Sequence, residues 1–221
     1  MDECSTTETQ RSRKFLCALC VSVVKLVFVC EEYSNLLGDV DSLAEQLTKR
    51  YRSQLACRAG CSSCCGHDLS IFEVEAAAVR SALPALPIHV RERVIRQARL
   101  VQARKVREEY VACPLLVDDL CAIYDARPII CRTQGLPLLY TAEDGRQEVD
   151  YCRLNFTRPA AKQDLDPDHL VQLDELNFKL AVTNLRYCRN LGILPAESGN
   201  RKPMSAIILE AEEPPDNTNL E

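Results

Sequence analysis

The chain has 221 residues, of which 47% are hydrophobic and 27% are charged. This composition is ordinary for one folded domain with terminal extensions, and it excludes wholesale disorder. The net charge of −5 argues against general nucleic-acid binding. The unusual feature is the 13 cysteines, an odd number that complete internal disulfide pairing cannot use.

A mostly apolar run covers residues 15–30 and follows a short basic stretch, as in a signal peptide. Lys25 interrupts this run, Glu31 and Glu32 stand where a small-residue cleavage site would be, and the run is shorter than the roughly 20 residues that span a bilayer. We therefore predict an accessory apolar segment over residues 1–35. A signal or anchor, and a misassigned translation start, remain open alternatives. We expect a cytoplasmic protein without membrane association.

Helical periodicity begins after this segment. Apolar residues recur every three or four positions over 36–56 and predict an amphipathic helix. A second helix is expected to begin at Ser70, which forms a capping box with Glu73, and to end before Pro84. A third helix is expected over 88–111, with a basic face that is either solvated or binds an acidic partner.

The pattern changes between residues 113 and 152, where prolines break any long helix. Two short segments, 136–141 and 147–151, read as strands of a hairpin with Gly145 at the turn. A last helix is expected from Pro167 to about Leu191, with Asp166 as its N-cap and a buried face that includes Leu185. Residues 196–221 read as an acidic, proline-containing tail that is disordered mainly beyond Leu209.

Eight of the cysteines form two sets that point to metal binding in a reducing compartment. The first set is a knot within nine residues: Cys57, Cys61, Cys64 and Cys65. The second set is spread along the chain: Cys113, Cys121, Cys131 and Cys152. Thiolates three or four residues apart can converge on one soft metal ion, whereas the wider spacings require loops to bring distant sulfurs together.

The two sets leave open how many metal sites exist. Cys64 and Cys65 are neighbours whose side chains point in different directions, so they serve different sites or only one of them is a ligand. Four arginines near the cysteines would offset the negative charge of a thiolate site, or are simply surface residues: Arg58, Arg127, Arg132 and Arg153. Of the five remaining cysteines, four are expected to be core thiols: Cys17, Cys20, Cys30 and Cys188.

The knot at 57–65, Cys-Pro-Leu at 113–115 and the run Cys-x-Ile-Tyr-x-x-Arg-Pro-x-x-Cys-Arg at 121–132 resemble the YkgJ-like cysteine-cluster family of zinc- or iron-chelating CxxCxxCC domains. Cys57 and Cys61 depart from that pattern, because three residues separate them instead of two. The resemblance spans about residues 40–190 and implies metal or iron–sulfur binding without a substrate. Part of a flagellin lysine methylase resembles the same cluster.

Together these observations predict a mainly α-helical, irregular, metal-stapled single domain over residues 36–195 with a small β-hairpin. Its expected function is to hold an iron–sulfur cluster or zinc through the eight cysteines, in a structural or electron-transfer role and with an unidentified redox or protein partner. A cluster-dependent enzyme, for redox chemistry or methyl transfer, is the alternative. A disulfide-bearing envelope protein is a third reading, which requires the apolar run to act as a signal.

Overall fold

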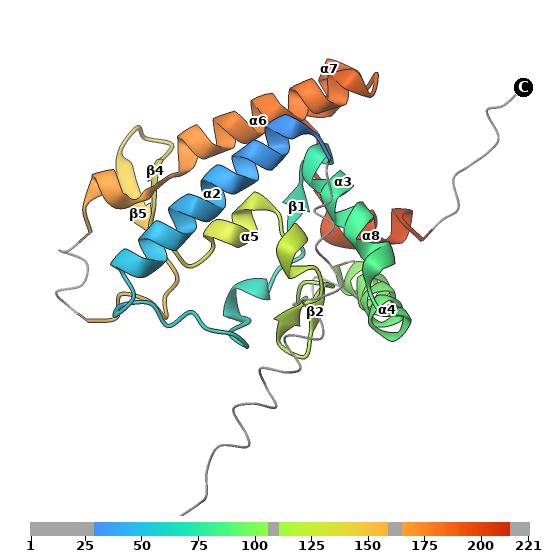
Figure 1. Cartoon of the computed structure of the whole chain (residues 1–221), viewed down its shortest axis with the longest axis horizontal. Helices are drawn as coiled ribbons and strands as arrows, with labels where there is room; N and C mark the ends of the chain where they lie inside the picture. The colour runs from blue at the N-terminus through green and yellow to red at the C-terminus, as the bar shows by residue number, and fades with distance from the viewer. Residues whose placement is uncertain (1–28, 106–110, 159–164, 213–221) are drawn as a thin grey trace, which may run out of the picture.

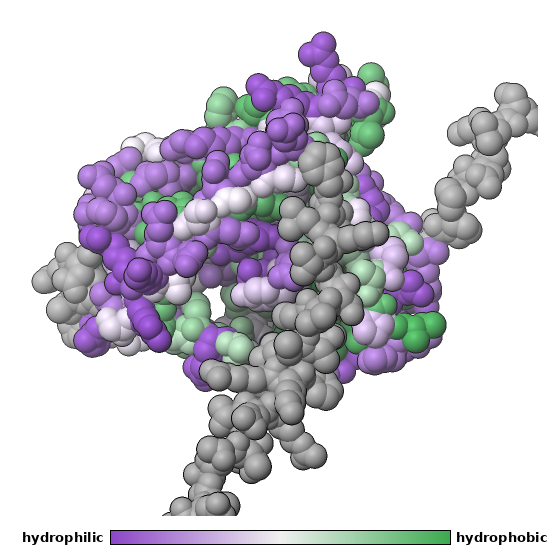
Figure 2. All heavy atoms as spheres, in the orientation of Figure 1, coloured by the Kyte–Doolittle hydropathy of each residue, from purple (hydrophilic) through white to green (hydrophobic). Residues whose placement is uncertain are grey.

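The computed structural model describes residues 29–105, 111–158 and 165–212. The fold is mainly helical with small sheets, as predicted. Two long helices, α2 (Glu31–Arg50) and α6 (Leu173–Asn190), lie side by side across one half of the molecule (Figure 1). Their outer face is mostly hydrophilic (Figure 2), while their inner faces bury residues such as Val40, Leu47 and Leu180. The periodicity seen in 36–56 thus marks a real buried face.

The other half of the molecule is built from α3 (Glu73–Ala82), α4 (Ile88–Lys105) and α8 (Met204–Glu210). These helices pack on one another around a second core that includes Val79, Val94 and Ile207. Helix α3 also turns Val74 toward the first core. It therefore lies between the two cores and joins them.

A three-stranded sheet covers one end of α6, in the order β5-β4-β6. Strands β4 (Leu138–Thr141) and β5 (Gln147–Asp150) form the predicted antiparallel hairpin, and Gly145 has a φ of +82° at its turn. Strand β6 (Val171–Gln172) pairs with β4 in parallel. Such a two-residue strand has too little sequence pattern to be predicted from periodicity.

Short elements connect the halves and carry the cysteines. They are the turns η1 (Ser63–Cys65), η2 (Leu83–Ala85) and η3 (Tyr124–Ala126), the helix α5 (Ile129–Thr133), and the strand pairs β1 (Ser70–Ile71) with β7 (Lys202–Pro203) and β2 (Leu116–Val117) with β3 (Leu120–Cys121). Helix α5 packs against α2. It thereby places one predicted ligand, Cys131, between the two halves.

Three predicted helix starts are wrong, and the first is that of α2, which covers Glu31–Arg50 and not residues 36–56. Ser70 lies in β1, and α3 begins after Phe72, whose backbone N–H donates to the Glu75 carboxylate at 3.1 Å. The last helix begins at Leu173, because Asp166 instead caps the short turn η5 (Pro167–His169) by accepting from the Asp168 N–H. The capping box of α3 is thus formed by Phe72 and Glu75 instead of Ser70 and Glu73, and the Asp166 cap belongs to η5 instead of the long helix.

The predicted tail and one predicted core residue also differ from the structure. Residues from 195 onward form α7 (Pro195–Ser198), β7 and α8, and Met204 and Ile207 are buried, so the fold continues past the expected boundary at 195. Residues 213–221 lie outside the described part of the chain, as do residues 1–28 with Cys4, Cys17 and Cys20. Leu185 is 46% exposed, although its spacing predicted a buried position.

Cys30 packs against the first core and Cys188 is buried in α6, as expected of core thiols. Among the residues described, no helix is long and apolar enough to cross a bilayer.

Candidate metal centre

Five of the predicted ligands lie near enough to one another to interact electrostatically. We call them the five-thiol group: Cys64, Cys65, Cys113, Cys121 and Cys131. They come from η1, from the segment before β2, from β3 and from α5. The junction between the knot and the distant set is direct, because the backbone N–H of Cys113 donates to the Cys65 carbonyl at 2.7 Å.

The thiols of this group interact with one another electrostatically. Burial, together with nearby thiols such as Cys121, raises the pKa of Cys113 and of Cys131 to about 12. Burial also raises the pKa of Cys121. The three thiols therefore hold their protons at neutral pH in the protein without metal. A bound cation would reverse that preference, because its positive charge stabilises thiolates.

The vicinal pair behaves differently from the other three thiols. Cys64 donates a hydrogen bond to the Cys65 sulfur, which lowers the pKa of Cys65 and raises that of Cys64. Cys64 is exposed and Cys65 is half-buried. The two neighbouring side chains thus contact each other, although we expected them to point in different directions, and they differ in their access to solvent.

Backbone amides already point at two of the sulfurs. The N–H of Leu115 donates to Cys113 and the N–H of Ile123 donates to Cys121, and each bond favours the thiolate form. In both cases the donor is two residues beyond the cysteine. Such hydrogen bonds orient sulfur ligands and tune the centre that they hold.

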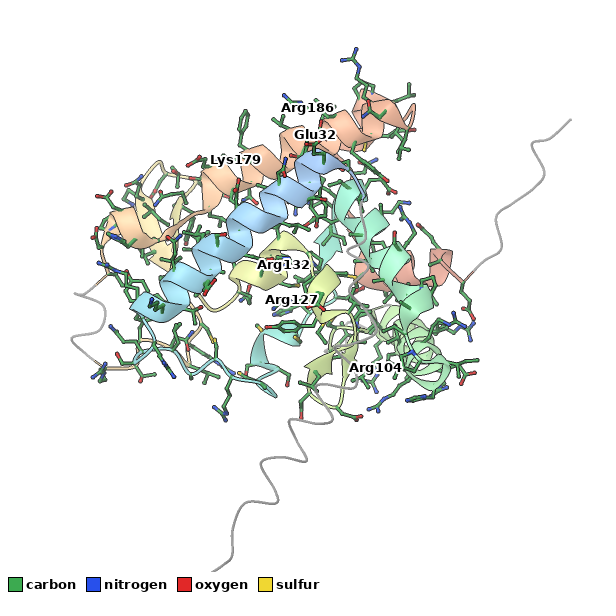
Figure 3. All side chains as sticks on the ribbon, viewed as in Figure 1. Glu32, Arg104, Arg127, Arg132, Lys179 and Arg186 are labelled. Atoms are coloured by element: carbon green, nitrogen blue, oxygen red, sulfur yellow. The ribbon has the colours of Figure 1, made fainter. Side chains whose placement is uncertain are left out.

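Two of the four arginines have defined places near the sulfurs, and Figure 3 shows them next to each other below α2. The Arg127 guanidinium stacks on the Tyr124 ring at 3.5 Å and lowers the pKa of Cys121 electrostatically. Arg132 instead forms two hydrogen bonds with Asp41, at 2.7 and 2.6 Å, and one with the Arg127 carbonyl at 2.9 Å. Arg127 therefore supplies compensating charge, whereas Arg132 fixes the segment before α5 to α2.

Helix α5 is held in place from a second side by Glu75. This side chain is 2% exposed, and its carboxylate accepts from the Ile129 N–H at 3.0 Å as well as from the Phe72 N–H. Burial raises the pKa of Glu75. One carboxylate thus accepts hydrogen bonds from backbone N–H groups at the starts of both α3 and α5, and it thereby sets the position of Cys131.

Cys57 and Cys152 lie together beside Gly135 and Asn155. The Asn155 side chain accepts from the Ala56 N–H at 2.7 Å and donates to the Gly135 carbonyl at 2.6 Å. Cys61 lies in the turn between Cys57 and η1, where its N–H donates to the Arg58 carbonyl at 3.0 Å. Of the eight predicted ligands, the structure therefore places five within electrostatic reach of one another. It sets Cys57 and Cys152 side by side, and it places Cys61 in the turn between Cys57 and η1.

Sequence reasoning missed Gly135, Asn155 and Glu75. A glycine directly after a short helix signals a positive φ, and Gly135 indeed has a φ of +92°. No comparable signal marks a buried asparagine or glutamate, because their partners are backbone groups distant in the chain.

The donor set fits a soft metal or an iron–sulfur cluster, since it consists of sulfur atoms with amide donors and a guanidinium beside them. Within residues 29–105, 111–158 and 165–212, no three His, Cys, Asp or Glu side chains are already set so that they could hold a metal ion.

A comparison with known protein families gives a match for this chain. Residues 56–153 match the CxxCxxCC family, whose description reads "Putative zinc- or iron-chelating domain". The match covers the segment that carries the clustered sulfur atoms. All eight predicted ligands lie within the matched range, and the other five cysteines lie outside it. The chain matches no curated protein and no solved structure.

Proposed function

We propose that this chain is a metal-binding protein that holds an iron–sulfur cluster, or else zinc, through the clustered cysteines of its CxxCxxCC domain. The observation that carries the proposal is the five-thiol group, in which sulfurs from distant segments interact with one another. A reducing compartment, the cytoplasm, suits this function, because the ligands must be free thiols. All cysteines in the described residues are free.

An iron–sulfur cluster is favoured over zinc by the donor set. The sulfur atoms include a vicinal pair, and the donors to them are backbone N–H groups and a nearby arginine. When bound, a cluster would supply a one-electron couple, whereas zinc would form a closed, redox-silent crosslink. The chain's own contribution is to exclude water around Cys113, Cys121 and Cys131, to donate hydrogen bonds to sulfur and to place Arg127 beside the group. A structural or electron-transfer role with a protein redox partner follows from this chemistry.

The test is anaerobic purification followed by metal analysis and an absorption spectrum. We expect iron and acid-labile sulfide with a visible absorption that dithionite bleaches. Zinc in an otherwise colourless protein would show that the centre holds zinc and not an iron–sulfur cluster. A protein that binds neither metal after anaerobic reconstitution would refute the proposal.

Cysteine variants test the ligand set. Cys131→Ser and Cys61→Ser are expected to lower both the bound metal and the thermal stability of the loaded protein, because metal binding and folding are coupled. Cys188→Ser is the matched control, since Cys188 is a buried thiol of α6 that donates to the Asn184 side chain at 3.6 Å. Unchanged metal content in both ligand variants would overturn the assignment.

A further inference from the structure

A buried asparagine joins three segments of the CxxCxxCC domain. Asn155 is 1% exposed, and its side chain bonds the backbone at Ala56 and Gly135, while its own N–H donates to the Cys152 carbonyl at 2.8 Å. The Ala56 N–H can only donate and the Gly135 carbonyl can only accept, so these two bonds fix which end of the amide is the NH₂ group. Each of these segments is close in sequence to a predicted ligand: Ala56 precedes Cys57, Gly135 follows Cys131, and Asn155 follows Cys152.

The fixed amide orientation aims a donor at sulfur. Asn155 Nδ2 lies 3.5 Å from Cys57 Sγ and donates to it, and the protonated Cys57 thiol in turn donates to Oδ1 over the longer distance of 4.0 Å. A sulfur that accepts hydrogen bonds is suited to the thiolate state, as in metal ligation, because each N–H stabilises its negative charge.

Gly135 makes this contact possible. A Cβ atom at this position would lie 2.9 Å from Cys57 Sγ and 3.9 Å from the Cβ of Cys152. The absence of a side chain therefore leaves room for the Cys57 sulfur, and the positive φ of the residue turns its carbonyl to the Asn155 amide.

A second buried asparagine shows that this arrangement is not a general packing device. Asn184 is also 1% exposed, accepts from the Val74 N–H at 3.1 Å and donates to the Ser198 carbonyl at 2.6 Å. It too lies beside a cysteine, but there the Cys188 thiol donates to Oδ1. In the hydrogen bonds of the described residues, Cys188 only donates to its asparagine, whereas Cys57 also accepts from the amide NH₂ group.

We propose that Asn155 is a positioning residue of the metal centre, which holds Cys57 in the pocket left by Gly135 and donates a hydrogen bond to its sulfur when that sulfur is a ligand. This inference rests on the proposed function and deepens it. It assigns Cys57 to the centre despite its departure from the family spacing. It also assigns distinct roles to two asparagines with the same burial.

The experiment compares Asn155→Asp with Asn184→Asp in the full chain. Each substitution keeps size and the acceptor oxygen and removes the same kind of amide donor. Cobalt(II) is titrated anaerobically into each metal-free protein, and the thiolate-to-cobalt absorption reports affinity and sulfur coordination. We expect Asn155→Asp to weaken cobalt binding by about tenfold or more and to change the absorption band. Asn184→Asp should retain the wild-type affinity and spectrum.

A glycine pair keeps the inference testable if Asn155→Asp fails to fold by circular dichroism. Gly135→Ala would push a methyl group against Cys57 Sγ, whereas Gly145→Ala strains a similar positive φ in open space. Weaker cobalt binding is expected only for Gly135→Ala.

The outcomes separate the two levels of the proposal. No thiolate-to-cobalt absorption in the wild-type protein would contradict the proposed function itself. Normal binding by the wild type, with equal affinity and spectra for Asn155→Asp and Asn184→Asp or for both glycine variants, would overturn only the role of Asn155 and its pocket.

Discussion

Tyr33 is a buried residue whose hydroxyl group has no hydrogen-bond partner within the part of the chain that the structure describes. Its side chain lies in the first turn of α2 and is 1% exposed, and burial raises its pKa above the ordinary value, with Glu75 adding to the effect. A buried, unpaired hydroxyl group costs free energy, because it has lost its bonds to water. The ring, in contrast, contributes to the first core.

We therefore predict that Tyr33→Phe leaves the unfolding free energy of the metal-free protein unchanged or raises it by up to about 1 kcal/mol. Tyr51→Phe is the control, because the buried Tyr51 hydroxyl donates to the His169 carbonyl at 3.1 Å. Its loss should cost about 0.5–1.5 kcal/mol in urea unfolding. Equal destabilisation by both variants would show that the Tyr33 hydroxyl is paired in solution.

The residue scale also shows what sequence reasoning can find. Cysteine spacing identified every member of the five-thiol group, because soft-metal ligands are chemically distinctive. It gave no hint of Asn155, since an amide that bonds backbone groups 99 and 20 residues away leaves no periodic or local pattern.

At the scale of elements, Glu75 connects α3 with α5. A glutamine at this position keeps one acceptor but places an NH₂ group against the N–H of Phe72 or Ile129. We predict that Glu75→Gln lowers the unfolding free energy by about 1–3 kcal/mol, the cost of one unpaired buried donor. Glu45→Gln, on the exposed side of α2, should have no measurable effect in the same urea titration.

The raised pKa of Glu75 gives this prediction a pH dependence. The folded protein keeps the proton of Glu75 above the ordinary pKa of 4.5, where the unfolded chain has lost it. The stabilisation from Glu75 is therefore complete below that value and declines as pH rises through the folded-state pKa. The difference between wild type and Glu75→Gln should accordingly narrow on going from acid to neutral pH, and a constant difference would contradict it.

Elements with long apolar periodicity were predicted well, and short ones were not. Leu36, Val40 and Leu47 marked the buried face of α2. Helix α8 was hidden in a segment whose prolines and acidic residues resemble a disordered tail, although Met204, Ile207 and Ile208 are buried there. Its position depends on tertiary packing against α3 and α4, which local pattern does not report.

At the scale of the whole molecule, metal binding should depend steeply on pH. The thiols of Cys113, Cys121 and Cys131 all have raised pKa values, so a metal must displace their protons at neutral pH. If all three ligate, cobalt(II) affinity is expected to fall by up to about a thousandfold for each unit by which pH is lowered in the neutral range. Competition titrations at several pH values measure this slope, and a slope near zero would exclude these thiols as ligands.

The pairing of β1 with β7 has a practical consequence for experiments on the isolated family-matched segment, residues 56–153. Ser70 and Ile71, inside the matched range, are hydrogen-bonded partners of Pro203 and Lys202, and the Met204 N–H donates to the Leu69 carbonyl at 2.8 Å. A recombinant fragment cut to residues 56–153 would lack β7, the helix α2 that packs on α5, and the helices α6 and α8 that pack on α3. Chelation measured on such a peptide would describe cysteines on an unsupported polypeptide, and its metal preference would say little about the intact molecule.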